Sequence, residues 1–236
     1  MEKVPKLILS IHIPKTGGFT FGNVLKKKYG KGLVWLAQST GMDDAAEKLK
    51  CLDWYRTKCF HGHTSYGLHQ YIPKDIPYGY VTFLRHPGER LLSIYYFLVY
   101  NNFAKDIGFE KWLRGKNAFL DNGVTRMLAG NMKITNDTVV RKVELEDYRR
   151  ALEHLRGFYF VGTTCTWQES VDKLASMLKW RSVPQAERVY DYSERRPHYD
   201  SLDSFVKLKI RLSQRWDFLL WNEAVRLNRD KYGVAV

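Results

Sequence analysis

The chain has 236 residues, of which 44% are hydrophobic and 27% are charged, values typical of a globular protein. This composition excludes a disordered chain, a collagen and a coiled coil, and no stretch approaches the roughly 20 apolar residues that span a bilayer. Lysine and arginine total 38 against 25 aspartates and glutamates, a formal net charge of +13. Such an excess favours anionic partners such as nucleotides, nucleic acid, acidic polysaccharide or anionic lipid, although a basic surface also serves solubility alone.

Apolar runs bounded by turn residues predict strands at 7–13, 32–38, 58–63, 78–85 and 158–164. Segments between and after them predict helices at 19–30, 43–50, 89–100, 145–157 and 167–180, short helices within 107–130, and one or two closing helices over 201–233. Strands that alternate with helices favour an α/β fold with a central parallel sheet flanked by helices. No repeat or linker interrupts the pattern, so we expect a single domain over residues 1–236.

The amino terminus and the cysteines bear on the compartment. The apolar run 7–13 is short, carries Ser10 and His12, and lacks a small-residue cleavage site, so it does not resemble a signal peptide. The sparse, odd set of cysteines favours a reducing compartment over a disulfide framework; they are Cys51, Cys59 and Cys165. We therefore expect a cytoplasmic protein.

A first candidate site joins the first strand to the first helix, and its residues are Pro14-Lys15-Thr16-Gly17-Gly18-Phe19-Thr20. Glycine N–H groups and a helix N-terminus attract anions, Lys15 adds a full charge, and Thr16 and Thr20 add hydroxyls. The segment therefore predicts a phosphate cradle. It is not a Walker A loop, because its lysine precedes the glycines. A tight strand-to-helix turn with an incidental lysine is the alternative.

A second candidate site lies where the fourth predicted strand ends and a helix begins, with the sequence Thr82-Phe83-Leu84-Arg85-His86-Pro87-Gly88-Glu89-Arg90-Leu91-Leu92-Ser93. Arg85 stands at the strand end, and Pro87 occupies a favoured first position of a helix. The planar guanidinium of Arg85 suits a phosphate, and Ser93 adds a hydroxyl. The alternative is that Arg85 or Arg90 pairs with Glu89 or caps a helix.

Histidines mark a third segment, Phe60-His61-Gly62-His63, with Cys59 before it and His69 after it. Cysteine and histidine are zinc ligands, although this spacing is not a common zinc pattern. Histidine also titrates near neutrality and therefore suits a general base that takes a proton from a hydroxyl group. Loop histidines that satisfy local hydrogen bonds are the third interpretation.

In order and spacing, the three segments resemble the sulfotransferases that use 3′-phosphoadenosine 5′-phosphosulfate (PAPS). The resemblance is to the carbohydrate branch, near the heparan sulfate and uronyl 2-O-sulfotransferases, and it covers the chain from Leu7 to about Tyr232. Supporting segments are Phe160-Val161-Gly162-Thr163, Asp121-Asn122, Thr125-Arg126 and Leu128-Ala129-Gly130. The chain departs from the pattern at Phe19, where a hydroxyl residue is frequent, and at His86, where aspartate is common.

The resemblance implies a P-loop-like nucleotide-binding fold and an O-sulfotransferase that releases adenosine 3′,5′-bisphosphate. It assigns the 5′-phosphosulfate to the first loop, whose residues are Lys15, Thr16, Gly17, Gly18, Phe19 and Thr20. It assigns the 3′-phosphate to Arg85 and Ser93, and a loop over the nucleotide to Arg195 and Arg196. It also makes His63 the base with His61 in support, and Lys15 the group that stabilises the leaving phosphate. No metal is implied.

The acceptor implied by the resemblance is a carbohydrate hydroxyl, with no nucleic-acid partner and no membrane span. Two other classes stay open from the residues themselves. A nucleotide-dependent phosphotransferase needs a carboxylate for Mg²⁺ at a strand end, and none stands out in the sequence. A non-catalytic binder of nucleic acid or another polyanion would need neither the paired phosphate segments nor the histidines.

Overall fold

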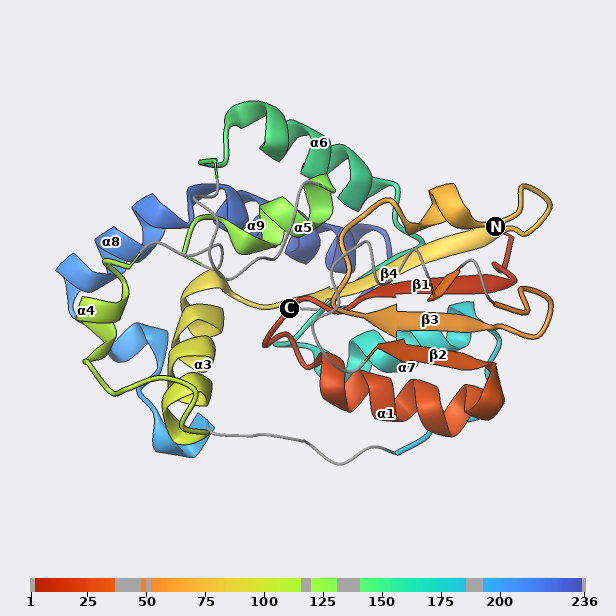
Figure 1. Ribbon diagram of the computed structural model, residues 1–236, viewed down its shortest axis with the longest axis horizontal. Coiled ribbons are helices and arrows are strands. Elements are labelled where there is room, and N and C mark those ends of the chain that lie inside the picture. The colour runs from red at the N-terminus through yellow and green to blue at the C-terminus, as the bar shows by residue number, and fades with distance from the viewer. Residues whose placement is uncertain are drawn as a thin grey trace.

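Figure 1 shows the computed structural model, which describes residues 3–36, 48–49, 52–115, 120–130, 141–185 and 193–234. The described residues form a five-stranded sheet in the order β2-β3-β1-β4-β5, and every neighbouring pair is parallel. The strands are β1 (Leu7–Ile11), β2 (Leu33–Leu36), β3 (Cys59–Gly62), β4 (Tyr78–Leu84) and β5 (Phe160–Thr163). The predicted α/β fold with a parallel sheet is thus confirmed.

The helices are α1 (Gly18–Tyr29), α3 (Pro87–Tyr100), α4 (Phe109–Trp112), α5 (Gly123–Ala129), α6 (Leu145–Arg156), α7 (Trp167–Met177), α8 (Ser204–Ser213) and α9 (Arg215–Asp230). In Figure 1, α1 and α7 lie on one side of the sheet and α5, α6 and α9 on the other. Pro87 opens α3, as its sequence position predicts. The helix predicted at 43–50 falls almost wholly outside the described residues.

One predicted helix is shorter than its periodic pattern. We expected the helix after β5 to run from Trp167 to Trp180, but α7 ends at Met177. Lys179 has a φ of 54°, in the left-handed region that stops a helix. The Trp180 side chain instead donates a hydrogen bond from Nε1 to Tyr29 Oη of α1, at 3.1 Å.

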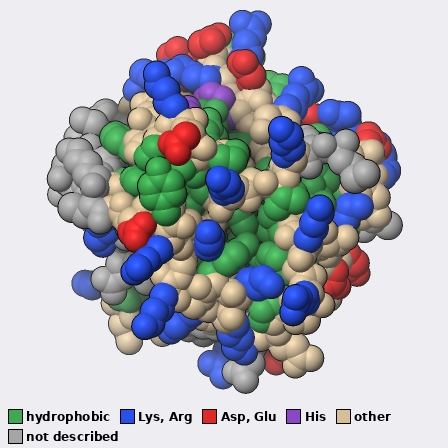
Figure 2. All heavy atoms as spheres, turned by 90° about the vertical axis from the view of Figure 1, so that its right-hand side faces the viewer, with side chains coloured by type: hydrophobic (Ala, Val, Ile, Leu, Met, Phe, Trp, Pro, Cys, Tyr) green, Lys and Arg blue, Asp and Glu red, His purple; other side chains and the backbone are tan. Residues whose placement is uncertain are grey.

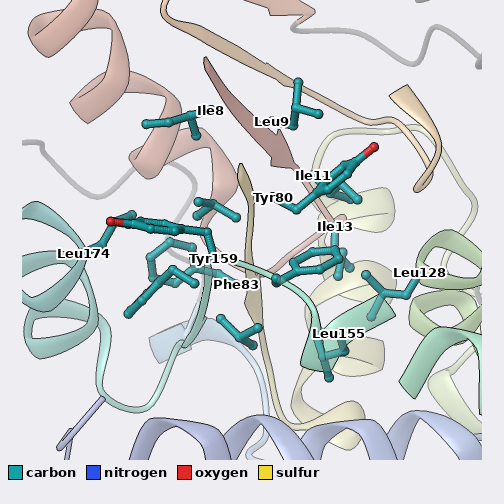
Figure 3. Close-up of a cluster of buried hydrophobic side chains, with 14 of the residues drawn as sticks. Ile8, Leu9, Ile11, Ile13, Tyr80, Phe83, Leu128, Leu155, Tyr159 and Leu174 are labelled. Atoms are coloured by element: carbon teal, nitrogen blue, oxygen red, sulfur yellow. The ribbon is translucent and has the colours of Figure 1, made fainter. Parts of the chain in front are cut away.

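The core explains why the strands are apolar along their length. All five residues of β1 are buried, since both faces of the sheet are covered by helices. Figure 3 shows Ile8 and Leu9 of β1 on opposite sides of the sheet, with Leu174 of α7 and Leu155 of α6 contributing to the two layers. The continuous apolar runs in the sequence are therefore the signature of a doubly covered parallel sheet.

The connections create a switch point between the two central strands. The chain leaves β1 through α1 toward β2 at one edge, whereas it leaves β4 through α3 to α6 toward β5 at the other. The two strands are adjacent, with Ile11 opposite Thr82 near their carboxyl ends. In open parallel sheets, ligands bind outside the carboxyl ends of the strands at such a point.

A buried polar network ties three helices together beyond this edge. Asp217 of α9 accepts hydrogen bonds from Thr125 N (2.8 Å) and Oγ1 (2.7 Å) at the start of α5, and from Arg90 Nη2 (3.2 Å) of α3. Asn122 Oδ1 in turn accepts from Trp216 N at 2.8 Å. Part of the Asp121–Arg126 segment therefore serves the packing of α3, α5 and α9.

Positive charge is spread over one face of the molecule. Figure 2 shows the face on the right of Figure 1, near the amino terminus, and lysine and arginine side chains are scattered over it among apolar ones. This face carries the amino ends of the strands, away from the switch point. Among the described residues, no helix is long and apolar enough to cross a membrane.

Candidate functional site

Residues from the three sequence segments meet at the carboxyl edge of the sheet. Lys15 follows β1, His63 follows β3, and Arg85 follows β4. Since β3, β1 and β4 are neighbours in the sheet, their carboxyl ends bring the three side chains to one edge. The structure therefore joins segments that the sequence separates by up to 70 residues.

The loop after β1 makes a sharp turn into α1. Lys15 has a φ of 66° and Gly17 a φ of 79°, so two residues take the left-handed conformation close together. A Cβ on Gly17 would lie 2.7 Å from Trp167 Cζ3, and one on Gly18 would lie 1.8 Å from His12 Cδ2. Glycine is thus required at both positions because the Trp167 and His12 rings pack against the backbone there. This packing is a separate reason for the glycines from the anion contacts that the sequence predicts.

The other predicted cradle residues have packing contacts of their own. Thr16 is buried, and its Oγ1 donates a hydrogen bond to Ile13 O at 2.8 Å, which braces the turn. Thr20 is buried within the first turn of α1. Phe19 is half-buried, with its ring edge-on to Trp35 at 5.5 Å between centroids. The turn is therefore built rigidly, with Lys15 as its charged group.

Lys15 lies in a group of cations. Its Nζ is 4.0 Å from the centre of the Phe97 ring on α3, and its carbonyl accepts a hydrogen bond of 3.4 Å from Arg85 Nη1. Burial, followed by the nearby charges of Arg85 and Arg196, lowers the pKa of Lys15 from 10.5 to about 8. A partly buried lysine whose pKa is perturbed by neighbouring cations is a candidate binding group for an anionic ligand.

Glu89 organises this group from the first turn of α3. Its Oε2 pairs with Arg85 Nη2 at 3.5 Å and accepts a hydrogen bond from Arg196 Nη2, while its Oε1 accepts from Tyr199 N at 2.6 Å. Burial raises the pKa of Glu89, but the hydrogen bonds from Tyr199 and Arg196 outweigh it and hold the pKa below its usual 4.5. The pairing of Arg85 with Glu89, one of the two interpretations from sequence, is thus present.

Of the remaining residues predicted to bind the nucleotide, two lie near Lys15 and Arg85 and one has an exposed side chain. Ser93 is half-buried and precedes Phe97 by one helical turn, so it lies on the face of α3 that Lys15 covers. Arg196 is buried and joins the cation group through Glu89. The Arg195 side chain is exposed, and its backbone carbonyl accepts a hydrogen bond from Tyr100 Oη. The structure therefore brings Arg196, rather than the Arg195 side chain, to Lys15 and Arg85.

His61 is enclosed. Its Nε2 lies 3.0 Å from Gly18 O, a carbonyl that can only accept, so Nε2 carries the proton. Its Nδ1 then accepts from Ser10 Oγ at 2.8 Å. Burial lowers the pKa of His61 to about 3. This neutral ring, with both nitrogens bonded, fixes the start of α1 against β1 and β3.

His63 differs in the nitrogen that it leaves available. Its Nδ1 lies 2.8 Å from His12 O and must donate to that carbonyl, so Nε2 carries the lone pair. Among the residues that the structure describes, no hydrogen-bond partner is present for Nε2. Burial lowers the pKa of His63 below 6.5, against the opposing effect of the bond to His12. A neutral, half-buried imidazole with a fixed tautomer is suited to accept a proton.

Sequence reasoning missed His12. Its ring lies between the other two, 4.0 Å from the centroid of His63 and 5.1 Å from that of His61. It is buried, and its Nδ1 has no hydrogen-bond partner within the described part of the chain. Burial and the neighbouring His63, His61 and Lys15 keep its pKa well below 6.5. Its position directly after an apolar strand, at the edge where ligands bind, was the available signal.

The cysteine and histidines of the third segment face different surroundings. Cys59 is buried, and burial raises the pKa of its thiol. His69 Nδ1 lies 3.0 Å from Tyr80 Oη. Across the described ranges, no group of three or more His, Cys, Asp or Glu side chains could hold a metal ion.

Comparison with known proteins adds no family to this geometry. The chain matches no protein-family model, and a search of curated proteins gave no matching sequence. The residues at the carboxyl edge of the sheet, and their arrangement there, are therefore the basis for inferring a function.

Proposed function

We propose that this protein is a PAPS-dependent O-sulfotransferase with a P-loop-like fold, and that its acceptor is the hydroxyl of a carbohydrate. The observation that carries the proposal is that Lys15, Arg85 and Arg196 lie together beside the switch point, with His63 at the same carboxyl edge of the sheet. A cation group supplies anion binding, and a neutral histidine supplies a base. Both are needed for transfer of a sulfuryl group to a hydroxyl group.

The charged residues fit a donor with anionic groups at both ends. The glycine turn forms the N-terminus of α1 and Lys15 directly precedes that turn, a favourable place for the 5′-phosphosulfate. Arg85 lies at the end of β4, and Ser93 follows on α3, where both can hold the 3′-phosphate. Burial, followed by the nearby charges of Arg85 and Arg196, lowers the Lys15 pKa, and an anion placed between Lys15 and Arg85 would favour the charged lysine.

The proton path follows from the tautomer of His63. The donor supplies an activated sulfuryl group, and the acceptor hydroxyl must lose its proton as the new S–O bond forms. His63 Nε2 takes that proton, while the Nδ1–H bond to His12 O holds the ring in the required orientation. Lys15 offsets the charge that develops on the leaving 5′-phosphate.

The compartment proposed from the cysteine count is the cytoplasm. Both cysteines in the described residues, Cys59 and Cys165, are free thiols. Free thiols are the usual state of cysteine in a reducing compartment.

Calorimetry with adenosine 3′,5′-bisphosphate and ATP tests the nucleotide assignment. We expect the bisphosphate to bind much more tightly, whereas a phosphotransferase would favour ATP with Mg²⁺. A non-catalytic polyanion binder would favour a long polyanion over either nucleotide. Incubation with labelled PAPS and a panel of mono-, oligo- and polysaccharides then tests the reaction. No binding of the bisphosphate by folded protein would refute the proposed donor, and no labelled carbohydrate would refute the proposed acceptor class.

A further inference from the structure

We propose that α8 is a membrane-surface helix that docks this protein on anionic lipid headgroups. The proposal does not depend on the sulfotransferase assignment, because it concerns the outer face of one helix. It rests on an exposed apolar stripe, on the basic residues beside that stripe, and on the position of the helix in the fold.

The apolar stripe consists of Phe205, Leu208 and Leu212, which we call the outer stripe. These side chains are 62%, 51% and 67% exposed. Their spacing of i, i+3 and i+7 places them on one face of the helix. The opposite face carries Val206 and Ile210, which are buried in a core cluster with residues of α3. The helix thus has one apolar face packed on the protein and a second that faces outward.

Basic residues border the outer stripe on both sides. By helical geometry, Lys209 follows the stripe on one flank and Arg211 lies on the other. Lys209 Nζ lies 4.1 Å from the centre of the Phe205 ring, so the ammonium stands beside the apolar surface. The helix itself contains no acidic residue, and its N-cap is Asp203. Exposed apolar residues flanked by cations are the pattern of helices that lie in the headgroup region of anionic membranes.

The charges favour lipid over a second copy of the chain. A two-fold contact through the outer stripe would bring the basic flanks of two copies together. An anionic bilayer instead neutralises those flanks while it buries the three apolar side chains. Exposed leucine and phenylalanine side chains scattered singly need no explanation, but three in one stripe on a ten-residue helix indicate an interaction surface.

The position of α8 links a membrane to the candidate site. Arg211 Nε donates to Tyr199 Oη at 3.3 Å, and Tyr199 N donates to Glu89, which holds the cation group. Figure 1 shows α8 beyond α3, on the side of the molecule toward which the carboxyl ends of the strands point. A membrane bound through α8 would therefore lie on the side of the candidate site, away from the face in Figure 2.

Vesicle sedimentation tests the proposal. The full chain is mixed with vesicles of phosphatidylcholine alone, or of phosphatidylcholine with phosphatidylserine. We expect binding to the vesicles that contain phosphatidylserine. We expect the triple variant Phe205→Ser, Leu208→Ser, Leu212→Ser to lose binding by at least about tenfold, since each change removes apolar surface that the bilayer would bury. The control Phe103→Ser removes a side chain that is 70% exposed outside α8, and it should bind as the wild type does.

Three results would overturn the proposal. The first is that the wild type does not bind vesicles with phosphatidylserine. The second is that the triple variant binds them as well as the wild type, which would assign binding to the scattered basic surface. The third is a wild-type dimer in analytical ultracentrifugation that the triple variant abolishes, which would show that a second copy covers the stripe. Circular dichroism of the triple variant checks its fold, and Lys209→Gln supplies a milder change that should weaken binding without removing an apolar side chain.

Discussion

Arg85 and Arg90 belong to the same sequence segment but differ in their surroundings. The difference distinguishes a residue that stabilises the fold from one that can bind a ligand. Arg90 is fully buried on α3 and pairs with Asp217, whose carboxylate also accepts hydrogen bonds from the start of α5. Arg85 stands five residues earlier at the end of β4, is only partly buried, and shares Glu89 with Arg196 while Lys15 lies beside it. The first cluster balances its charges internally, whereas the second holds several cations around one carboxylate.

The difference shows how to interpret charged residues in an unfamiliar sequence. The buried Arg90–Asp217 pair balances its own charges and leaves none for a ligand, although Arg90 Nε has no hydrogen-bond partner among the described residues. Burial and the neighbouring Arg85 and Arg196 lower the pKa of Lys15, so a bound anion would stabilise its charged form. We therefore expect substitutions around Asp217 to change stability, and substitutions at the strand ends to change binding and turnover.

The largest effect is expected at His63, where the comparison predicts loss of function without loss of fold. His63→Ala removes the Nε2 lone pair and should lower turnover by about 100- to 10,000-fold, the usual contribution of a general base. Affinity for adenosine 3′,5′-bisphosphate should stay nearly unchanged. Turnover is measured with labelled PAPS, and His69→Ala is the control. A variant that keeps more than about a tenth of wild-type turnover would place the base elsewhere.

The pH profile sharpens this prediction. Burial lowers the His63 pKa, so the neutral base persists below pH 6.5. Wild-type turnover should therefore hold at pH 6.5 and decline only at lower pH, as the ring gains a proton. A decline that begins above pH 6.5 would contradict the buried environment of His63 in the structure.

The next largest effect is expected on the stability of the fold, at the buried pair of Arg90 and Asp217. Asp217→Ala leaves the Arg90 guanidinium buried without its counter-charge, and breaking such a pair costs about 3–5 kcal/mol of unfolding free energy. Urea unfolding followed by circular dichroism measures this loss. Asp230→Ala on the same helix is the control, since its ion pair with Arg229 lies at the surface and contributes little. Equal unfolding midpoints for the two variants would contradict the supporting role of Asp217.

Much of the fold could be predicted from the sequence because buried parallel strands consist of continuous apolar residues. β1 and β4 lie within the predicted ranges 7–13 and 78–85 for this reason. The premature end of α7 was not predicted, because a lysine in the left-handed conformation has no sequence signature. Local patterns thus predicted the elements, while one helix boundary depended on the backbone of a single residue.

Part of the candidate site could also be predicted, because some of its residues directly follow predicted strands. Strand-end positions placed Lys15 and Arg85 at one edge, and the structure brings them into contact. His12 was hidden within an apolar run, and only the tertiary stack with His61 and His63 separates it from a core residue. The link between Arg196 and Glu89 spans 107 residues, so no local pattern could reveal it.

A smaller effect is expected at Arg85, where binding should change and stability should not. Arg85→Ala removes a charged hydrogen-bond donor and should weaken adenosine 3′,5′-bisphosphate by about 1.5–3 kcal/mol. Adenosine 5′-phosphate, which lacks the 3′-phosphate, should be affected much less. Isothermal calorimetry compares the two ligands, with the exposed Arg181→Ala as control. An equal loss for both ligands would show that Arg85 does not bind the 3′-phosphate.

The smallest effect concerns the proton on Lys15. Its pKa of about 8 in the ligand-free protein means that the ammonium is half lost at that pH, whereas a bound anion favours the charged form and raises the pKa. Affinity for the bisphosphate should therefore fall as pH rises above 8, by at most about tenfold per pH unit because one proton is involved. The phosphates do not contribute to this slope, since their second ionisation lies near pH 6.

Calorimetry in buffers of different ionisation enthalpy measures this linkage directly, because binding should take up a fraction of a proton near pH 8. Lys15→Arg is the matched variant, since a guanidinium keeps its charge throughout this range. It should bind with an affinity that is flat between pH 7 and pH 9. If the wild type is equally flat, Lys15 does not contact the anion. If Lys15→Arg keeps the wild-type dependence of affinity on pH, another group titrates. The group of Lys15, Arg85 and Arg196 would then not be the anion site that its contrast with Arg90 and Asp217 suggests.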